Sequence, residues 1–141
     1  MNAAIRAVVR TDIFHQFEVY GIQRGYEGLI QNTLVPMNLN SVAGIIQHGG
    51  TMLKTARSSA FMTQEGFDKA IGTLRDWQID VLVVIGGDGS MSGACKLVNS
   101  GIKTMVIPAT IDNDMPGTDY TIGFDTAVNN VLDAVNKIRD T

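Results

Sequence analysis

With 141 residues, the chain has the length of about one domain and enough apolar residues, 45%, to bury a core. Its net charge is −3 and it contains no dense basic run, which argues against a general nucleic-acid or membrane-surface binder. A single cysteine excludes an internal disulfide and a cysteine-rich zinc site. An apolar signal core and an apolar run of about 18 residues are both absent, so we expect a cytoplasmic protein without a membrane span.

The first half of the chain contains signals for two helices, a strand and a loop. Asn2 can cap a first helix, whose apolar positions recur at helical spacing: they are Ile5, Val8, Val9 and Ile13. Residues 17–22 alternate loosely and predict a strand. Residues 40–47 predict a short helix, and residues 51–61 have little periodicity and predict a loop.

The second half alternates between helices and strands. Thr63 begins a helix with one apolar face formed by Phe67, Ala70, Ile71 and Leu74. The apolar, largely β-branched run 81–85 is typical of a parallel strand buried on both faces. The next helix has a predicted buried stripe of Met91, Ala94, Cys95 and Val98. Residues 105–107 predict another strand, and a final helix carries Val128, Val131, Leu132, Val135 and Ile138.

This alternation predicts an α/β fold with three layers around a doubly wound, mostly parallel sheet. Ligands of such sheets collect at the carboxyl ends of the strands. Two segments rich in glycine and aspartate, residues 86–93 and 108–126, begin at such ends.

The first segment, GGDGSMSG, follows an apolar strand and opens a helix. Its backbone amides can bind phosphate beside Asp88, which could hold Mg²⁺, and Ser90 can cap the helix or contact a phosphate oxygen. Close approach of the backbone requires residues without a Cβ, which are Gly86, Gly87 and Gly89. An ordinary strand-to-helix turn is the alternative, and the aspartate inside the loop weakens it. The segment matches neither the P-loop nor the dinucleotide fingerprint.

The second segment crowds Asp112, Asn113 and Asp114 into a turn directly after a strand. Carboxylates at that position can meet a substrate hydroxyl opposite the bound phosphate. The two segments together predict a site for phosphoryl transfer.

Several motifs give the chain a resemblance to the 6-phosphofructokinases, in their ATP-dependent branch. They are GGDGS after VLVVI, PATIDND, GTDYTIGFDTA, and the earlier MNAAIR, GYEGL and GGTMLKTAR. Diacylglycerol-type lipid kinases and NAD kinases carry a similar GGDG loop, whereas TIDND followed by GFDTA is highly specific. The resemblance covers essentially the whole chain.

For the acceptor side, the resemblance implies that Asp112 is the general base, which takes the proton from the 1-hydroxyl of fructose 6-phosphate. Thr110 and Ile111 match positions that line the sugar, and Asp114 matches a second carboxylate close to substrate and metal. As an alternative, Asp114 is only a turn residue.

For the donor side, the resemblance implies that Asp88 is the Mg²⁺ ligand and that ATP contacts Gly87, Gly89, Ser90 and Gly93. Arg57 matches an arginine that reaches the transferring phosphates, with Ser58 beside it, and Tyr26 matches an aromatic near the nucleotide. As alternatives to these roles, Arg57 is a solvated surface residue and Tyr26 serves only in packing.

Donor and effector preference depend on five positions. Pyrophosphate-dependent members usually carry an acidic residue at the position of Gly89 and lysine at that of Ala109, so the small residues here favour ATP. Arg6 and Arg10, four residues apart on one helical face, match effector-binding arginines, or they form a solvated charged face. Leu39 replaces another effector arginine, which argues against classical control by nucleotides or phosphoenolpyruvate.

The resemblance also implies parts that this sequence does not contain: a preceding strand with a second glycine loop, and a following lobe with arginines that hold the sugar phosphate. We therefore expect residues 1–141 to be an incomplete N-terminal ATP-binding and catalytic lobe, inactive alone, of a glycolytic homotetramer. The alternatives are a non-catalytic nucleotide-binding fragment or pseudoenzyme, a pyrophosphate-dependent enzyme, and another kinase with a GGDG loop.

Overall fold

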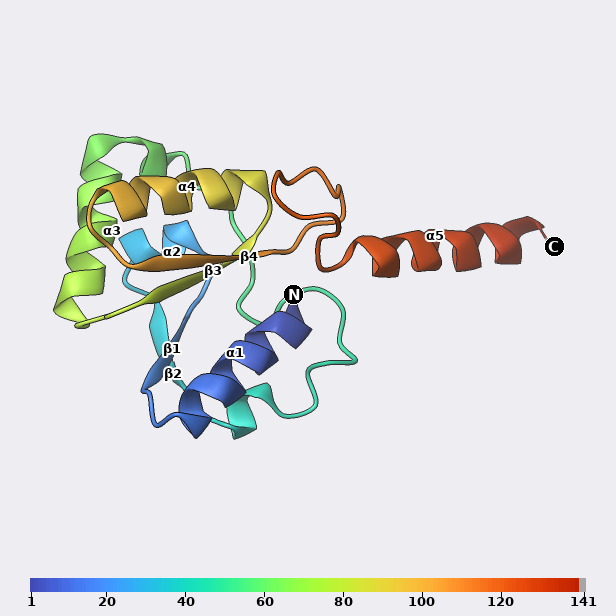
Figure 1. Cartoon of the computed structure of the whole chain (residues 1–141), viewed down its shortest axis with the longest axis horizontal. Helices are drawn as coiled ribbons and strands as arrows, with labels where there is room; N and C mark the ends of the chain where they lie inside the picture. The colour runs from blue at the N-terminus through green and yellow to red at the C-terminus, as the bar shows by residue number, and fades with distance from the viewer. Residues whose placement is uncertain (140–141) are drawn as a thin grey trace. The chain divides into compact units, whose positions relative to one another are not determined.

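The computed structural model describes residues 1–139 and separates into two compact units (Figure 1). The N-terminal unit is Asn2–Val81, and the C-terminal unit starts at Leu82 and includes Met1. The first contains α1 (Asn2–Phe14), β1 (Val19–Ile22), α2 (Tyr26–Ile30), β2 (Leu34–Met37), the 3₁₀ helices η1 (Asn40–Val42) and η2 (Ala60–Met62), and α3 (Gln64–Asp76). The second contains β3 (Leu82–Gly86), α4 (Asp88–Asn99), β4 (Thr104–Pro108) and α5 (Phe124–Arg139).

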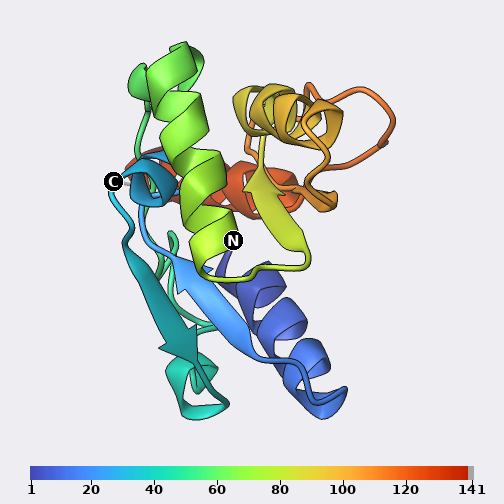
Figure 2. The ribbon, with the colours of Figure 1, turned by 90° about the vertical axis from the view of Figure 1, so that its left-hand side faces the viewer.

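In the N-terminal unit, β1 and β2 form an antiparallel pair, and α2 packs against α3 (Figure 2). The pairing runs from Val19 opposite Met37 to Ile22 opposite Leu34. Apolar side chains from several elements are buried in this unit, among them Leu29, Val42, Phe61, Ala70 and Leu74. Removing these side chains from water supplies the main driving force for folding.

Three elements of this unit differ from the sequence predictions. The apolar periodicity does not predict α2, which has only five residues, or β2, which contains Pro36. Proline is tolerated in β2 because a two-stranded sheet leaves one side of each strand unpaired. The helix predicted over residues 40–47 is a single 3₁₀ turn, because Gly44 follows it at φ +66°, a left-handed conformation that ends helices.

Asn2 has a different role from the predicted helix cap. It is the first residue of α1, it is buried, and its amide ties down the loop that follows η1. Its Nδ2 donates to the carbonyl oxygen of His48 at 2.9 Å, and its Oδ1 accepts from the amide of Met52 at 2.8 Å. The predicted apolar face of α1 is only partly buried, by Ile5 and Val9 with Ala4.

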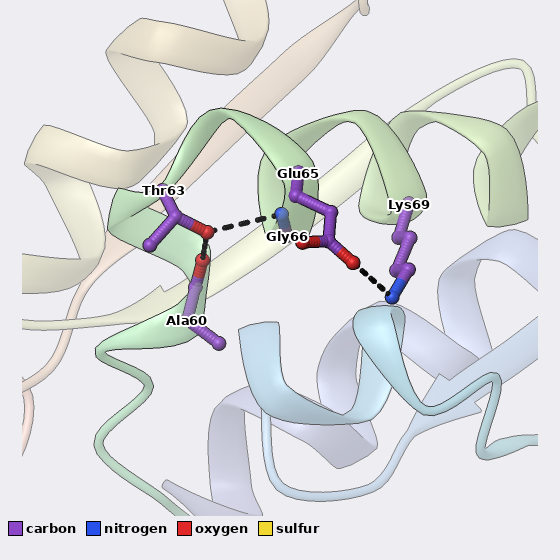
Figure 3. A network of polar contacts seen from close by, with 5 residues as sticks. All are labelled: Ala60, Thr63, Glu65, Gly66 and Lys69. Atoms are coloured by element: carbon purple, nitrogen blue, oxygen red, sulfur yellow. Dashed lines mark hydrogen bonds and ion pairs between the residues drawn. The ribbon is translucent and has the colours of Figure 1, made fainter.

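The predicted start of α3 is confirmed. The Thr63 hydroxyl accepts a hydrogen bond from the Gly66 amide at 3.1 Å and donates one to the Ala60 carbonyl at 2.7 Å (Figure 3). One turn further, the Lys69 ammonium lies 2.8 Å from the Glu65 carboxylate and lowers the pKa of Glu65 by hydrogen bonding and by its charge. The helix buries the predicted Ala70, Ile71 and Leu74, and the Phe67 ring meets Phe61 edge-on.

In the C-terminal unit, β3 and β4 are parallel, with Leu82 opposite Thr104 and Gly86 opposite Pro108. Helix α4 connects them and packs against both. Its buried residues are Gly93, Ala94 and Leu97. The predicted stripe is therefore correct only at Ala94: Met91 is half-buried, and Cys95 and Val98 are exposed. Gly93 and Ala94 lie on the buried face, and residues this small allow a helix to approach neighbouring strands closely.

Helix α5 forms over the predicted residues, but its apolar stripe is not buried within the described chain. Val128, Val131, Leu132, Val135 and Ile138 are between 41% and 76% exposed. Alternating helices and strands with a parallel pair confirm the α/β class, although the β1–β2 pair is antiparallel. No helix within residues 1–139 has both the length and the apolarity needed to cross a membrane.

Candidate functional site

The two segments singled out in the sequence meet at one end of the parallel pair. Beyond the last paired residues of β3 and β4, the Ala109 amide donates to the Gly86 carbonyl oxygen at 2.9 Å. A Cβ added to Gly87 would lie 3.2 Å from the Cβ of Thr110. The glycine loop and the acidic turn therefore touch, as expected for the carboxyl ends of neighbouring parallel strands.

The start of α4 provides the phosphate side of the candidate site. Gly87 occupies the N-cap position, and Asp88 is the first helical residue. Ser90 lies within the first turn, so the prediction that it caps the helix is wrong. Because glycine has no side chain with which to cap, the first-turn amides of α4 are not bonded by an N-cap side chain. Such amides, at the positive end of the helix dipole, are suited to bind a phosphate group.

The loop glycines have two different functions. A Cβ at Gly86 would clash with the Ser90 side chain, so packing within the loop requires glycine there. A Cβ at Gly89 would meet nothing within 4 Å, and both Asp88 and Gly89 are exposed. The fold therefore does not explain Gly89, whose open side leaves space for a ligand. Gly93, one turn further along α4, is buried.

The acidic turn presents two carboxylates to solvent. Asp112 and Asp114 are exposed, and Ile111 between Thr110 and Asp112 is 65% exposed. The Thr110 hydroxyl lies 3.3 Å from Asp112 Oδ2, to which it donates, and 3.3 Å from the Asp112 amide, from which it accepts. Thr110 thus orients Asp112 locally while leaving most of the carboxylate accessible.

Asn113 is a residue of this turn for which the sequence suggested no particular role. It has φ +53°, and its side-chain amide bonds to the backbone of residues 119 and 121. The signal was present in the sequence, because asparagine is the non-glycine residue that most readily takes a left-handed conformation.

Three predicted donor-side residues belong to the N-terminal unit. The Tyr26 ring stacks on Phe61 with centroids 4.2 Å apart and planes at 10°, so the packing alternative holds for one face of this ring. The Ser58 hydroxyl donates to Glu27 Oε2 at 2.6 Å and accepts from the Phe61 amide at 3.2 Å. Arg57 is exposed beside it. Glu27, which anchors the loop next to Arg57, was not identified from the sequence.

The predicted effector arginines differ from each other. Arg6 Nη1 donates to the Val42 carbonyl oxygen at 2.6 Å and ties α1 to η1, whereas Arg10 is exposed. Further along this unit, Leu39 lines an open hollow of about 620 Å³ together with Ile13, Phe17, Tyr20 and Met37. There the Tyr20 hydroxyl donates to Glu18, which raises the pKa of Tyr20.

The side chains near the glycine loop fit Mg²⁺ if a single carboxylate serves as the protein ligand. No group of three or more histidine, cysteine, aspartate or glutamate side chains converges within residues 1–139. Mg²⁺ does not need one, since it commonly binds one or two carboxylates and completes its shell with phosphate oxygens and water. The exposed carboxylate of Asp88, in the first turn of α4, satisfies that requirement.

Parallel strands that end in a glycine loop and an adjoining acidic turn define an α/β protein with a candidate phosphate-binding edge. The chain belongs to the phosphofructokinase family, whose model matches residues 1–141. Relatives from Paenibacillus macquariensis and Clostridioides difficile, both named ATP-dependent 6-phosphofructokinase, are 60% and 58% identical to it over 141 residues. All of this chain is covered in both comparisons, but only 44% of each relative.

Solved structures agree with this assignment. The phosphofructokinase of Saccharomyces cerevisiae superposes with a TM-score of 0.90 at 38% identity, over 99% of this chain and 22% of the other. That of Pichia pastoris, in its T-state, gives 0.89 at 35% identity, over 100% and 17%. A pyrophosphate-dependent phosphofructokinase from Marinobacter aquaeolei shares the fold, with a TM-score of 0.75 at 24% identity over 87% and 33%. The predicted family and fold class are confirmed.

Proposed function

We propose that this chain supplies the ATP-binding and base-bearing part of a 6-phosphofructokinase. The reaction transfers the γ-phosphoryl group of ATP to the 1-hydroxyl of fructose 6-phosphate and yields fructose 1,6-bisphosphate and ADP, a step of glycolysis. The observation that carries this proposal is the contact between the two loops, in which Ala109 bonds to Gly86 and Thr110 adjoins Gly87. The names of the relatives support it.

Asp112 is the proposed general base. The 1-hydroxyl oxygen of the sugar attacks the γ-phosphorus, the bond from that phosphorus to the ADP oxygen breaks, and the hydroxyl proton passes to the Asp112 carboxylate and then to water. Asp112 is exposed at the edge where the phosphate-binding amides begin, which suits this role. Thr110 orients its carboxylate, and Asp114 and Ile111 are proposed to face the sugar.

The phosphate side is proposed to consist of the first turn of α4 with Asp88, Gly89 and Ser90, and of Gly87 before it. Asp88 would hold Mg²⁺, which when bound neutralises charge on the β- and γ-phosphate oxygens. By the resemblance alone, Arg57 is also assigned to the transferring phosphates, for which a guanidinium fork is suited. We further assign Ser58, Tyr26 and Gly93 to the nucleotide on the strength of the resemblance alone.

ATP is the proposed donor rather than pyrophosphate. The space beside Gly89 is open, whereas a second acidic residue there would fill it with negative charge. Ala109 is 1% exposed, so a lysine at this position would need room that the described chain does not provide. The residues at both positions therefore favour a nucleoside triphosphate over pyrophosphate as the phosphoryl donor.

The base assignment is tested by replacing Asp112 with alanine in the complete polypeptide that carries this sequence. We expect kcat for fructose 6-phosphate to fall by about 10²–10⁴-fold, since a positioned base contributes this much, while the dissociation constant of MgATP changes little. Asp119→Ala is the matched control, because Asp119 is an exposed acidic residue of the same segment that uses only its backbone carbonyl. We expect it to retain turnover.

Two other results would contradict parts of the proposal. Near-normal turnover in Asp112→Ala would show that another group accepts the proton. MgATP binding by the unaltered polypeptide without any turnover of fructose 6-phosphate would replace the kinase by a non-catalytic nucleotide-binding protein. Turnover of diacylglycerol or NAD instead would favour another kinase with the same loop.

For the complete protein we propose a cytoplasmic homotetramer, by resemblance. Anion binding at Arg6 and Arg10 is the weakest part of this proposal, because Arg6 already donates to the Val42 carbonyl. Sedimentation of the complete protein tests the tetramer. Activity titrated with ADP or phosphoenolpyruvate, in the unaltered protein and in Arg10→Ala, tests the effector site: an identical response would exclude Arg10 from it.

A further inference from the structure

The segment between β4 and α5, residues 109–123, contains neither helix nor strand, yet it carries both carboxylates of the acidic turn. Its conformation is fixed by two side chains of its own. Asn113 Oδ1 accepts from the Thr121 amide at 2.8 Å, and Asn113 Nδ2 donates to the Asp119 carbonyl at 3.2 Å. The side-chain amide of this one asparagine thus supplies both an acceptor and a donor to the backbone, and it closes the loop between residues 113 and 121.

Thr121 continues this link toward β4. It is only 4% exposed, and its hydroxyl donates to the Thr110 carbonyl oxygen at 2.7 Å. The next amide, that of Ile122, donates to the Pro108 carbonyl at 3.0 Å. The returning chain is therefore bonded back onto the end of β4, directly before Asp112.

We propose that Asn113 and Thr121 are positioning residues that hold the Asp112 carboxylate in its reactive place. This inference rests on the proposed function. Asn113 is adjacent to Asp112, and Thr121 fixes Thr110, whose hydroxyl contacts the Asp112 carboxylate. A base is effective only within hydrogen-bond reach of the proton that it accepts, so a loose turn lowers the rate of the chemical step more than the affinity for ATP.

Asparagine is required at position 113 for two separate reasons. It adopts φ +53° at low cost, and its amide has both a donor and an acceptor. Asn113→Gly keeps the left-handed conformation and removes both bonds, whereas Asn113→Asp keeps the acceptor and places a carboxylate against the Asp119 carbonyl. Thr121→Val preserves the shape of the side chain and removes the hydroxyl, and Thr121→Ser restores it.

The test measures kcat, KM and MgATP binding of these variants in the complete polypeptide, together with amide hydrogen exchange over residues 109–123. We expect kcat per ATP-binding site to fall about 100-fold in Asn113→Gly and Thr121→Val, as small misplacements of reacting groups do, with MgATP affinity unchanged and faster exchange confined to this segment. Thr121→Ser should recover most of kcat.

Three other results would contradict either the positioning role or the proposed function. Wild-type kcat in Asn113→Gly and Thr121→Val, with Asp112→Ala inactive, would overturn the positioning role and leave the proposed function intact. A loss of MgATP binding in parallel with kcat would show general unfolding and would also overturn it. An unaltered polypeptide without turnover of fructose 6-phosphate would overturn the proposed function, and the positioning role for that reaction with it.

Discussion

At the scale of single residues, two glycines of the glycine loop differ in why they are glycine: one is required by packing, and the other leaves space for a ligand. Gly86 has no room for a side chain, because a Cβ would clash with Ser90, while Gly89 faces open space. Sequence alone treats these glycines as equivalent, since both lie in the same GGDG motif. The distinction depends on the path of the first turn of α4, which only the structure shows.

We therefore expect Gly89→Asp to raise the dissociation constant of MgATP by about tenfold or more, because a second negative charge would face the phosphates. The stability of the protein should remain unchanged. Gly89→Ala is the matched control that adds volume without charge, and isothermal titration with MgATP measures both. Equal affinities of Gly89→Asp and the unaltered protein would place the phosphates elsewhere.

Gly86→Ala should behave in the opposite way. It introduces a clash inside the loop and should lower the free energy of unfolding by about 1–3 kcal/mol, the usual cost of overpacking. Urea denaturation beside Gly89→Ala makes the comparison direct. A Gly86→Ala protein as stable as Gly89→Ala would mean that the loop relaxes around the added carbon.

At the scale of elements, a local signal predicted the start of α3 correctly, whereas the face that α4 buries was predicted wrongly. Threonine is a favoured N-cap residue, and α3 begins directly after Thr63, whose side chain accepts from the Gly66 amide. The stripe on α4 was misjudged because Met91 and Val98 do not lie on the buried face of the helix, whereas Leu97, which the prediction left out, does. Gly93, Ala94 and Leu97 form that face, and their burial depends on tertiary packing that apolar periodicity does not reveal.

The cap of α3 is a quantitative test at this scale. Thr63→Ala removes the acceptor for the Gly66 amide and the donor to the Ala60 carbonyl, so we expect the N-terminal unit to lose about 1 kcal/mol of stability. Thr63→Ser, which keeps the hydroxyl, should lose much less. Denaturation followed by the fluorescence of Trp77, which lies at the other end of α3, measures the change. Equal stabilities of the alanine and serine variants would show that the hydroxyl contributes nothing.

At the scale of the whole molecule, the sequence predicted the family, the α/β class and the location of the two loops, because these depend on short motifs at strand ends. It did not predict the antiparallel β1–β2 pair or the Asn113 link, because apolar periodicity and short motifs do not reveal which strands pair or which backbone groups a side chain bonds. The predicted site on the C-terminal unit is one continuous arrangement of Gly86–Ser90 with Thr110–Asp114. The roles of Tyr26, Arg57 and Ser58, on the N-terminal unit, stay predictions.

Helix α5 raises the last question at this scale, because its apolar stripe is exposed throughout the described chain. A contiguous apolar face of this kind promotes association in water.

We expect the 141-residue polypeptide, prepared by itself, to self-associate and to bind the dye ANS. Leu132→Glu should reduce both self-association and dye binding, because it places a charge in the stripe. Asn130→Glu, which adds the same charge on the opposite face of α5, is the control and should leave both unchanged. Sedimentation velocity together with dye fluorescence decides between these cases. A monomer that binds no dye would mean that the stripe is covered by residues of the chain itself.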